Sequence, residues 1–245
     1  MSCTAKYIDI NTIDDYLSAI SSYGLLDRRW IFRGQNQIVT QALLPSIGRG
    51  IPSNTLIGTH LNEKMSFDIF KHSLPLHGLF LQQLKTVDLL AIAQHYKLNT
   101  RLLDWSSSPL IALYFACDKV CTSPPPVVYA CMFKDESYKG YYIPNWNEDL
   151  NPFEVKEITV YATDFIDTRV YNQRGVFTIH PYDMSSDRYE GINEATSNLE
   201  QMLVFRITDK IGVKMKLERL GFSPLTIYNT LEATAEYANN WKLFD

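Results

Sequence analysis

The hydrophobic pattern of the chain changes character at residues 124–126, where three successive prolines stop any helix. Before this point several segments repeat apolar residues at helical spacing, whereas the later runs are rich in β-branched and aromatic residues. The predicted helices cover about residues 12–20, 54–72, 84–96, 109–116, 209–220 and 224–239. The predicted strands cover residues 7–10, 30–33, 127–133, 156–162, 175–181 and 202–208. Helices followed by strands favour an α+β fold over alternating βαβ units.

The composition limits the class of protein. A chain of 245 residues with 46% hydrophobic content can bury a substantial core, and no linker or repeat divides it, so we expect one domain over residues 1–245. A net charge of -4 and scattered lysines and arginines argue against nucleic acid as a partner. The apolar stretches are too short to cross a bilayer, and the N-terminus lacks a signal-peptide pattern. We therefore expect a cytoplasmic protein with no membrane partner.

The cysteines do not predict a disulfide scaffold or a metal site. Four cysteines are too few for a scaffold in a chain of this length, and Cys117 and Cys121 stand four apart with no CxxC pair beside them. We expect reduced thiols and no bound metal.

Polar chemistry is concentrated in residues 91–116, AIAQHYKLNTRLLDWSSSPLIALYFA. A segment that only packs does not need so many polar groups between apolar runs. The polar cluster ends where an apolar helix begins, and unpaired N–H groups at a helix N-terminus favour anions. The candidate residues are His95, Thr100, Arg101, Asp104, Trp105, Ser106, Ser107 and Ser108. We expect a ligand to bind at this segment.

Each of these residues also has a structural interpretation. Arg101 and Asp104 are spaced to form an ion pair at a strand end, and one serine is expected to cap the helix that starts at Pro109. His95 fits an acid or base and equally a hydrogen-bond partner of Asp104. Trp105 fits a stacking surface for a planar ligand, although core packing is the simpler role.

Two further blocks carry related chemistry. In Phe32-Arg33-Gly34-Gln35, an arginine at a strand end precedes a glycine that would let the backbone approach a ligand. The alternative is a buried arginine paired with a carboxylate, followed by a turn glycine. In RVYNQRGVF, residues 169–177, Gln173 precedes a strand and fits either a ligand contact or a turn contact.

Together the three blocks resemble the FRG domain, a bacterial family named for its Phe-Arg-Gly motif. Residues 32–35 match the name-giving element, and residues 93–105 are similar to the family pattern AQHxGxPTRLLDWT. The pattern R-x-x-x-Q-x-G-x-F is matched by residues 169–177, and the resemblance extends from about residue 7 to about residue 238. The chain departs from the family at Lys97, where glycine is usual, at Asn99, where proline is usual, and at Ser106, where threonine is usual.

The FRG architecture in turn resembles the ADP-ribosyltransferase fold, a split pair of antiparallel sheets that holds NAD in a cleft. In the Arg-Ser-Glu class of those enzymes, an arginine binds the NAD phosphates, a serine-bearing strand leads into a helix, and a glutamate stabilises the transition state. The resemblance assigns the first role to Arg33, the second to residues 106–108 and the third region to residues 173–175. Gly175 then stands where the catalytic glutamate is expected, and a glycine supplies no charge.

These observations leave two hypotheses. The first is an ADP-ribosyltransferase or NAD glycohydrolase, acting as a bacterial toxin or phage-defence effector, with NAD as substrate and a protein as the second partner. This hypothesis gives catalytic roles to Arg33, His95, Asp104 and Gln173. It gives ligand contacts to Arg33, Gly34, Gln35, Thr100, Arg101, Trp105, Ser106 and Ser107. The second hypothesis is a non-catalytic recognition module in which the same polar groups form a structural network.

Overall fold

A computed structural model describes residues 3–36, 43–49, 59–79, 84–118, 125–139, 150–163 and 168–240. The described helices are α1 (Ile13–Ser22), α2 (Thr59–Ser73), α3 (Thr86–His95), α4 (Pro109–Cys117), α5 (Thr168–Asn172), α6 (Lys210–Arg219), α7 (Pro224–Ile227) and α8 (Leu231–Asn240), with the 3-10 turns η1 (Ser46–Gly48), η2 (Leu74–His77) and η3 (Asp135–Ser137). No helix in these ranges is long and apolar enough to cross a membrane.

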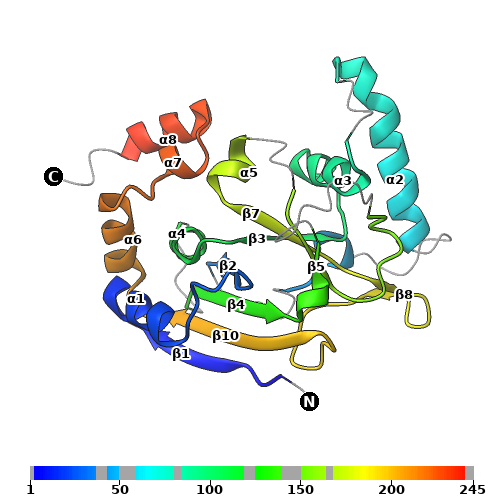
Figure 1. Ribbon diagram of the computed structural model, residues 1–245. Helices are drawn as coiled ribbons and strands as arrows, with labels where there is room; N and C mark the ends of the chain where they lie inside the picture. The colour runs from blue at the N-terminus through cyan, green and yellow to red at the C-terminus, as the bar shows by residue number, and fades with distance from the viewer. Residues whose placement is uncertain are drawn as a thin grey trace.

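The central element is a sheet of eight described strands, drawn as arrows in Figure 1. Their order across the sheet is β1 (Lys6–Ile10), β10 (Leu199–Ile207), β4 (Val127–Phe133), β2 (Ile31–Gln35), β3 (Leu102–Ser106), β7 (Gly175–Ile179), β6 (Thr159–Tyr161) and β5 (Tyr138–Lys139). The pairs β1–β10 and β5–β6 are parallel, and the other pairs are antiparallel. A separate hairpin joins β8 (Tyr182–Asp183) to β9 (Arg188–Tyr189).

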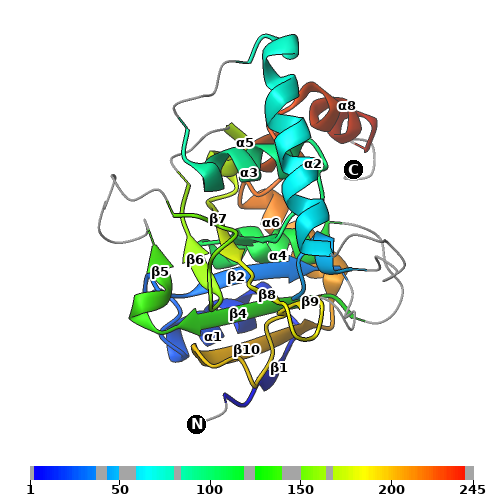
Figure 2. The ribbon, with the colours of Figure 1, turned by 90° about the vertical axis from the view of Figure 1, so that its right-hand side faces the viewer.

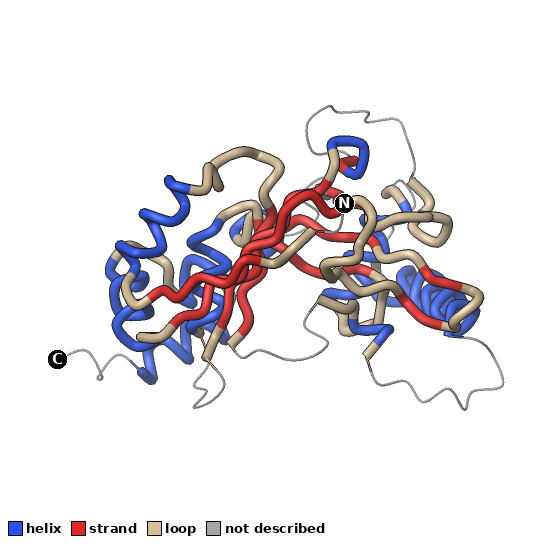
Figure 3. Tube along the Cα trace, turned by 90° about the horizontal axis from the view of Figure 1, so that it is seen from below, coloured by secondary structure: helices blue, strands red, loops and turns tan. Residues whose placement is uncertain are grey.

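The strands form a twisted band between two groups of helices, as the view from below shows (Figure 3). On one side α1, α4 and α6 cover a core that alternate residues of β4 enter, including Val128 and Ala130. The next residues along β4, Val127 and Tyr129, enter a second core on the opposite face. At the other end of the band α2 stands beside α3, close to β8 (Figure 2). The whole of β4 is buried because it lies in the middle of this arrangement.

The sheet is continuous, but its two halves are joined by a single residue pair. Strand β2 pairs with β4 along five residues, and β3 pairs with β7 along five residues. Between β2 and β3 the register contains only Phe32 opposite Ser106. Beyond this pair the two strands diverge. The described strands therefore form one mixed sheet with a weak junction instead of the expected split antiparallel sheet, and this junction positions the candidate site.

The α+β prediction is confirmed, while two details of it were wrong. Strands β1, β2 and β3 precede the prolines and belong to the same sheet as the later strands, so the chain does not divide into a helical half and a strand half. The predicted helix 224–239 is two helices, α7 and α8. The break occurs at Asn229, whose positive φ of 49° ends helical geometry. Residues 54–58 of the predicted second helix lie outside the described ranges.

Candidate functional site

The divergence of β2 from β3 opens a cavity of about 690 Å³, a size typical of ligand pockets. Its walls come from the end of β2, from α3, β3 and the end of α4, and from α5, β7 and the residue after α7. The lining residues that enter the chemistry are Arg33, Gly34, Gln35, Arg49, Gln94, His95, Lys97, Asp104, Trp105, Ser106, Phe115, Asp118, Arg169, Gln173 and Tyr228. The three sequence blocks thus meet at one concave surface.

Arg33 bridges the point where the two strands separate. Its Nη1 donates a hydrogen bond of 2.6 Å to the backbone carbonyl oxygen of Asp104 on β3. Its Nε is buried and has no hydrogen-bond partner among the described residues. Burial lowers the pKa of Arg33 to about 10, although the nearby Asp104 carboxylate opposes this shift. An arginine with one fixed contact and one unused buried donor is well placed to receive an acceptor group from a ligand.

The packing of α4 against β2 requires a glycine at position 34. A Cβ built on Gly34 would lie 1.8 Å from the carbonyl oxygen of Ala112 and 2.7 Å from the amide nitrogen of Ala116. Both atoms belong to α4, which therefore crosses β2 in direct backbone contact at this residue. The glycine of the Phe-Arg-Gly motif allows this contact, since any side chain would push the helix away from the strand.

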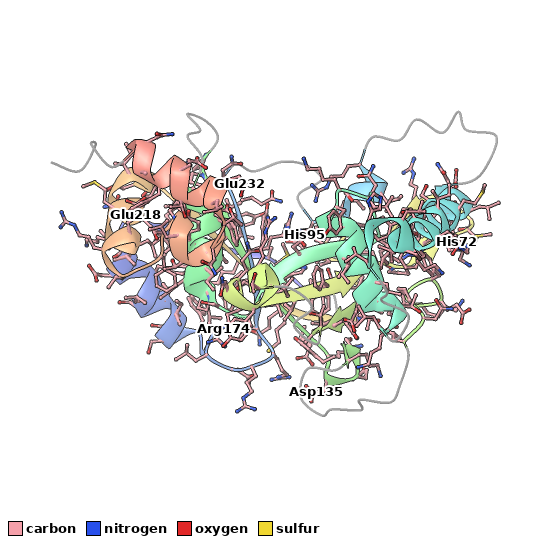
Figure 4. The ribbon with its side chains drawn as sticks, turned by 90° about the horizontal axis from the view of Figure 1, so that it is seen from above. His72, His95, Asp135, Arg174, Glu218 and Glu232 are labelled. Carbon is pink, nitrogen blue, oxygen red and sulfur yellow. The ribbon has the colours of Figure 1, made fainter. Side chains whose placement is uncertain are left out.

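Asp104 presents its carboxylate to the cavity. Its Oδ1 accepts a hydrogen bond of 2.7 Å from Nε2 of Gln94, a cavity residue that the sequence hypothesis did not single out. His95 was one candidate partner for Asp104, and this hydrogen bond comes from the residue before it. His95 lies exposed on the same wall, with its ring edge-on to Tyr96. It stands near the middle of the molecule in the view from above (Figure 4).

The predicted ion pair between Arg101 and Asp104 was wrong. Arg101 is fully buried and pairs with Glu63 of α2, with Nη2 at 2.6 Å and Nε at 3.0 Å from Oε2. Tyr189 donates to the same carboxylate oxygen at 2.7 Å. Arg101 directly precedes β3 and lies three residues before Asp104, and an odd separation along an extended chain puts two side chains on opposite faces. Arg101 therefore holds α2 against the sheet and does not line the cavity.

One of the three serines caps the helix, as predicted, and the other two contact the turn before β7. The hydroxyl of Ser108 caps α4 by accepting from the amide of Ile111 at 3.5 Å. Ser106 donates to the carbonyl of Gln173 at 2.7 Å, and Ser107 donates its amide to the carbonyl of Arg174 at 2.9 Å. These contacts attach the turn before β7 to β3. Ser106 lines the cavity, whereas Thr100 and Ser107 do not.

Trp105 has the core role that was the simpler expectation. It is 4% exposed, and its indole N–H donates to the hydroxyl of Thr178 at 2.9 Å. Thr178 in turn contacts Nε2 of the buried His180 at 2.8 Å, and Nδ1 of His180 lies 2.6 Å from the carbonyl oxygen of Glu190. Part of Trp105 still reaches the cavity wall. This series of hydrogen bonds fixes Trp105 and the part of the cavity wall to which it belongs.

Gln173 lines the cavity with a buried Nε2 that has no hydrogen-bond partner among the described residues. It follows α5 and precedes Arg174, whose positive φ of 49° turns the chain into β7 (Figure 4). Gly175 follows at the start of the strand, where a Cβ would lie 3.1 Å from a side-chain carbon of Val170. No carboxylate arises from positions 173–175. Gln173 and Arg33 therefore contribute two unused buried donors to one cavity.

The far end of the cavity was not predicted from the sequence. Asp118 accepts hydrogen bonds of 3.0 Å from the hydroxyls of both Tyr114 and Tyr228, one on each carboxylate oxygen. Burial and the adjoining Asp118 carboxylate raise the pKa of Tyr228. The guanidinium of Arg169 lies over the Tyr228 ring, 5.6 Å from its centroid, and Phe115 meets the same ring edge-on. Helical spacing alone could not indicate that residues so distant in sequence meet here.

The charges of the lining residues favour an anion. Four cationic side chains, Arg33, Arg49, Lys97 and Arg169, face two carboxylates, Asp104 and Asp118, in a chain whose net charge is -4. Within the described ranges no three His, Cys, Asp or Glu side chains gather as a metal site would require. Of the cysteines in those ranges, Cys3, Cys117 and Cys131 are free, as expected, and Cys121 lies outside them.

A family model described as the FRG domain matches residues 28–123. No curated protein and no solved structure matches the chain significantly, so the likeness to the ADP-ribosyltransferase fold gains no support. The matched range contains Arg33, Gly34 and Asp104 with the strands and helix that carry them, whereas Gln173 and Tyr228 lie outside it. The comparison therefore supports the assignment of residues 28–123, which form most of the cavity wall, to the FRG domain.

Proposed function

We propose that this cavity binds a nucleotide of the NAD class and that the protein cleaves the bond between its nicotinamide and ribose. The observation that carries the proposal is the pair of unused buried donors, Nε of Arg33 and Nε2 of Gln173, on the walls of one cation-rich cavity. Buried donors without partners are costly, so a ligand that supplies acceptors would be stabilised there. Phosphate oxygens suit Arg33 and the neighbouring Arg49, and a carboxamide or ribose hydroxyl suits Gln173.

Asp104 is the carboxylate that this reaction would use. The Asp118 carboxylate already accepts two phenolic hydrogen bonds, whereas Oδ2 of Asp104 receives no hydrogen bond from the described residues. When the bond between C1′ of the ribose and the nicotinamide nitrogen breaks, the electron pair leaves with nicotinamide and positive charge develops on the ribose. Asp104 would stabilise that charge in place of the glutamate that Gly175 cannot supply.

The remaining steps need an acceptor and a base. Water, in a glycohydrolase, or a side chain of a protein target, in a transferase, would add to C1′ and give up its proton. His95 lies on the same wall as Asp104 and is the residue that would take this proton. A protein with this activity would act on the cellular NAD pool, as a toxin or phage-defence effector does.

The test is to incubate the purified protein with NAD and follow nicotinamide release together with the thermal shift that NAD produces. We expect cleavage by the unchanged protein and a loss of about a hundredfold for Arg33→Met and for Asp104→Asn. Arg28→Met is the matched control, because Arg28 is exposed and does not line the cavity. Absence of both cleavage and thermal shift at millimolar NAD would exclude the proposal.

A second candidate is a recognition module that binds without cleaving. The observation that favours it is the absence of a carboxylate at positions 173–175 together with the structural contacts of Ser106 and Ser108, which join β3 to the turn before β7 and cap α4. The same experiment separates the two candidates. A thermal shift with NAD or ADP-ribose, lost in Arg33→Met and unaccompanied by nicotinamide release, supports the module.

A further inference from the structure

We propose that Gln94 is a positioning residue that fixes the orientation of the Asp104 carboxylate, and that Thr100 fixes Gln94 in turn. The proposal concerns residues whose sequence-based assignment was different, since Thr100 was expected to contact the ligand and Gln94 was assigned no role. It deepens the proposed function, on which its turnover readout rests, while its spectroscopic readout does not depend on any nucleotide.

The direction of each hydrogen bond follows from the chemistry of the groups. The Thr100 hydroxyl oxygen accepts from the backbone amide of Leu102 at 3.2 Å, and its proton is donated to Oε1 of Gln94. The Gln94 amide therefore has its carbonyl toward Thr100 and its NH₂ group toward Asp104. Because an ionised carboxylate can only accept, this is the orientation that satisfies Oδ1 of Asp104, 2.7 Å from Nε2.

Thr100 provides a rigid base for this chain of contacts. It is fully buried, its amide donates to the Ser46 hydroxyl at 3.2 Å, and its carbonyl accepts from the amide of Ile47 at 3.3 Å. The turn η1 that supplies these two contacts leads directly to Arg49, a cation of the cavity. The chain of hydrogen bonds thus runs from a buried anchor to an exposed carboxylate.

Asp104 is consequently held at two places. Arg33 binds its backbone carbonyl from β2, and Gln94 binds one carboxylate oxygen from α3. The second oxygen receives no hydrogen bond from the described residues. A carboxylate that accepts a hydrogen bond on one oxygen and is open on the other has a fixed direction toward the cavity, which is what stabilisation of a developing positive charge requires. Because Asp104 is exposed, the packing of the fold does not require its carboxylate to be held in one orientation.

The first test is nuclear magnetic resonance of the Gln94 side-chain amide in the unliganded protein. We expect the hydrogen bond to the Asp104 carboxylate to shift one of its two N–H resonances, and the shift to vanish in Asp104→Ala. Thr100→Val, which removes the hydroxyl, is expected to weaken the shift, and Thr100→Ser to preserve more of it. A Gln94 amide whose resonances ignore Asp104 would overturn the proposal.

The second test measures turnover of NAD by Gln94→Leu. We expect kcat to fall about tenfold to a hundredfold with KM changed by less than about threefold, because the lost contact is a hydrogen bond to a charged group. Gln201→Leu is the control, since Gln201 is exposed on β10 and outside the cavity. A lower melting temperature with unchanged kcat would reduce Gln94 to a structural role. If the unchanged protein does not turn over NAD, the proposed function fails and the resonance experiment alone decides the positioning role.

Discussion

The two arginines of the FRG-like motifs, Arg33 and Arg101, lie in opposite environments. Arg101 is fully buried, and its guanidinium is engaged by Glu63, by the ring nitrogen of His60 and by the carbonyl oxygen of Pro152. Arg33 donates to one backbone carbonyl and keeps a buried Nε without a partner among the described residues. A guanidinium with a partner on each nitrogen indicates a structural role, and an unused donor in a cavity indicates a place for a ligand.

This difference leads to a paired prediction on stability. Arg101→Met should lower the free energy of unfolding by about 3–5 kcal/mol, because it leaves the Glu63 carboxylate buried without its cation. Arg33→Met should cost about 1 kcal/mol, because it removes one hydrogen bond at the edge of a cavity. Urea unfolding of both variants measures the two values. Equal losses of unfolding free energy would contradict the difference in role between Arg101 and Arg33.

The double variant Arg101→Met with Glu63→Leu sharpens this result. If the loss in Arg101→Met arises from an uncompensated buried charge, replacing Glu63 as well should restore part of the stability. Tyr189 would then lose its acceptor, so the recovery should be incomplete. A double variant less stable than the sum of the single changes would contradict this explanation.

The sequence could predict that Arg33, Asp104 and Gln173 belong to one site, since the three blocks that carry them match one pattern. It could not predict which of Arg33 and Arg101 lines the cavity. The residues next to Arg33 and Arg101 in the sequence do not distinguish the two arginines. The difference depends on Glu63, which lies 38 positions before Arg101 in the chain and pairs with it. The same limit applies to Tyr228, whose contact with Asp118 joins residues 110 positions apart.

Local signals were more reliable because they depend on neighbours in sequence. Three serines before Pro109 predicted a capped helix, and Ser108 caps α4. Gly34 was expected to let the backbone approach a ligand, and the group that comes close to it in the structure is the backbone of α4. A glycine in a sequence pattern indicates that another group comes close to the backbone at that residue. Which group this is depends on the packing of elements distant in the sequence.

The charges of both arginines act on the pKa of the buried His180, which supplies the second prediction. Burial lowers its pKa from 6.5 to about 4, with Arg33, Arg101 and Arg49 adding to the shift and the carbonyl of Glu190 opposing it. Because the unfolded chain binds a proton at higher pH than the folded one, this histidine makes the protein lose stability as pH falls from about 6.5 to about 4. The loss should approach about 3 kcal/mol.

Unfolding by urea at several values between pH 4 and pH 7 measures this dependence. His180→Gln should flatten the curve while leaving the contribution of other acidic groups, so the difference between the two proteins isolates the histidine. If the two curves run parallel, His180 does not titrate as its burial requires. Arg33→Met should weaken the pH dependence of stability slightly, because it removes one of the cations that lower the pKa of His180.

The smallest expected effect is at Lys97, on the rim of the same cavity. Lys97 follows α3 with a φ of 70°, and its amide donates to the carbonyl of Gln94, in the geometry of a helix end that favours glycine. Lys97→Gly should therefore stabilise the protein by about 0.5–1 kcal/mol, since relief of the left-handed strain exceeds the added flexibility of the unfolded chain. Lys134→Gly is the matched control, because Lys134 is exposed with a φ of -61° and should lose stability instead. Loss of stability in both variants would mean that the charge of Lys97 contributes more to the cavity rim than its backbone strain costs.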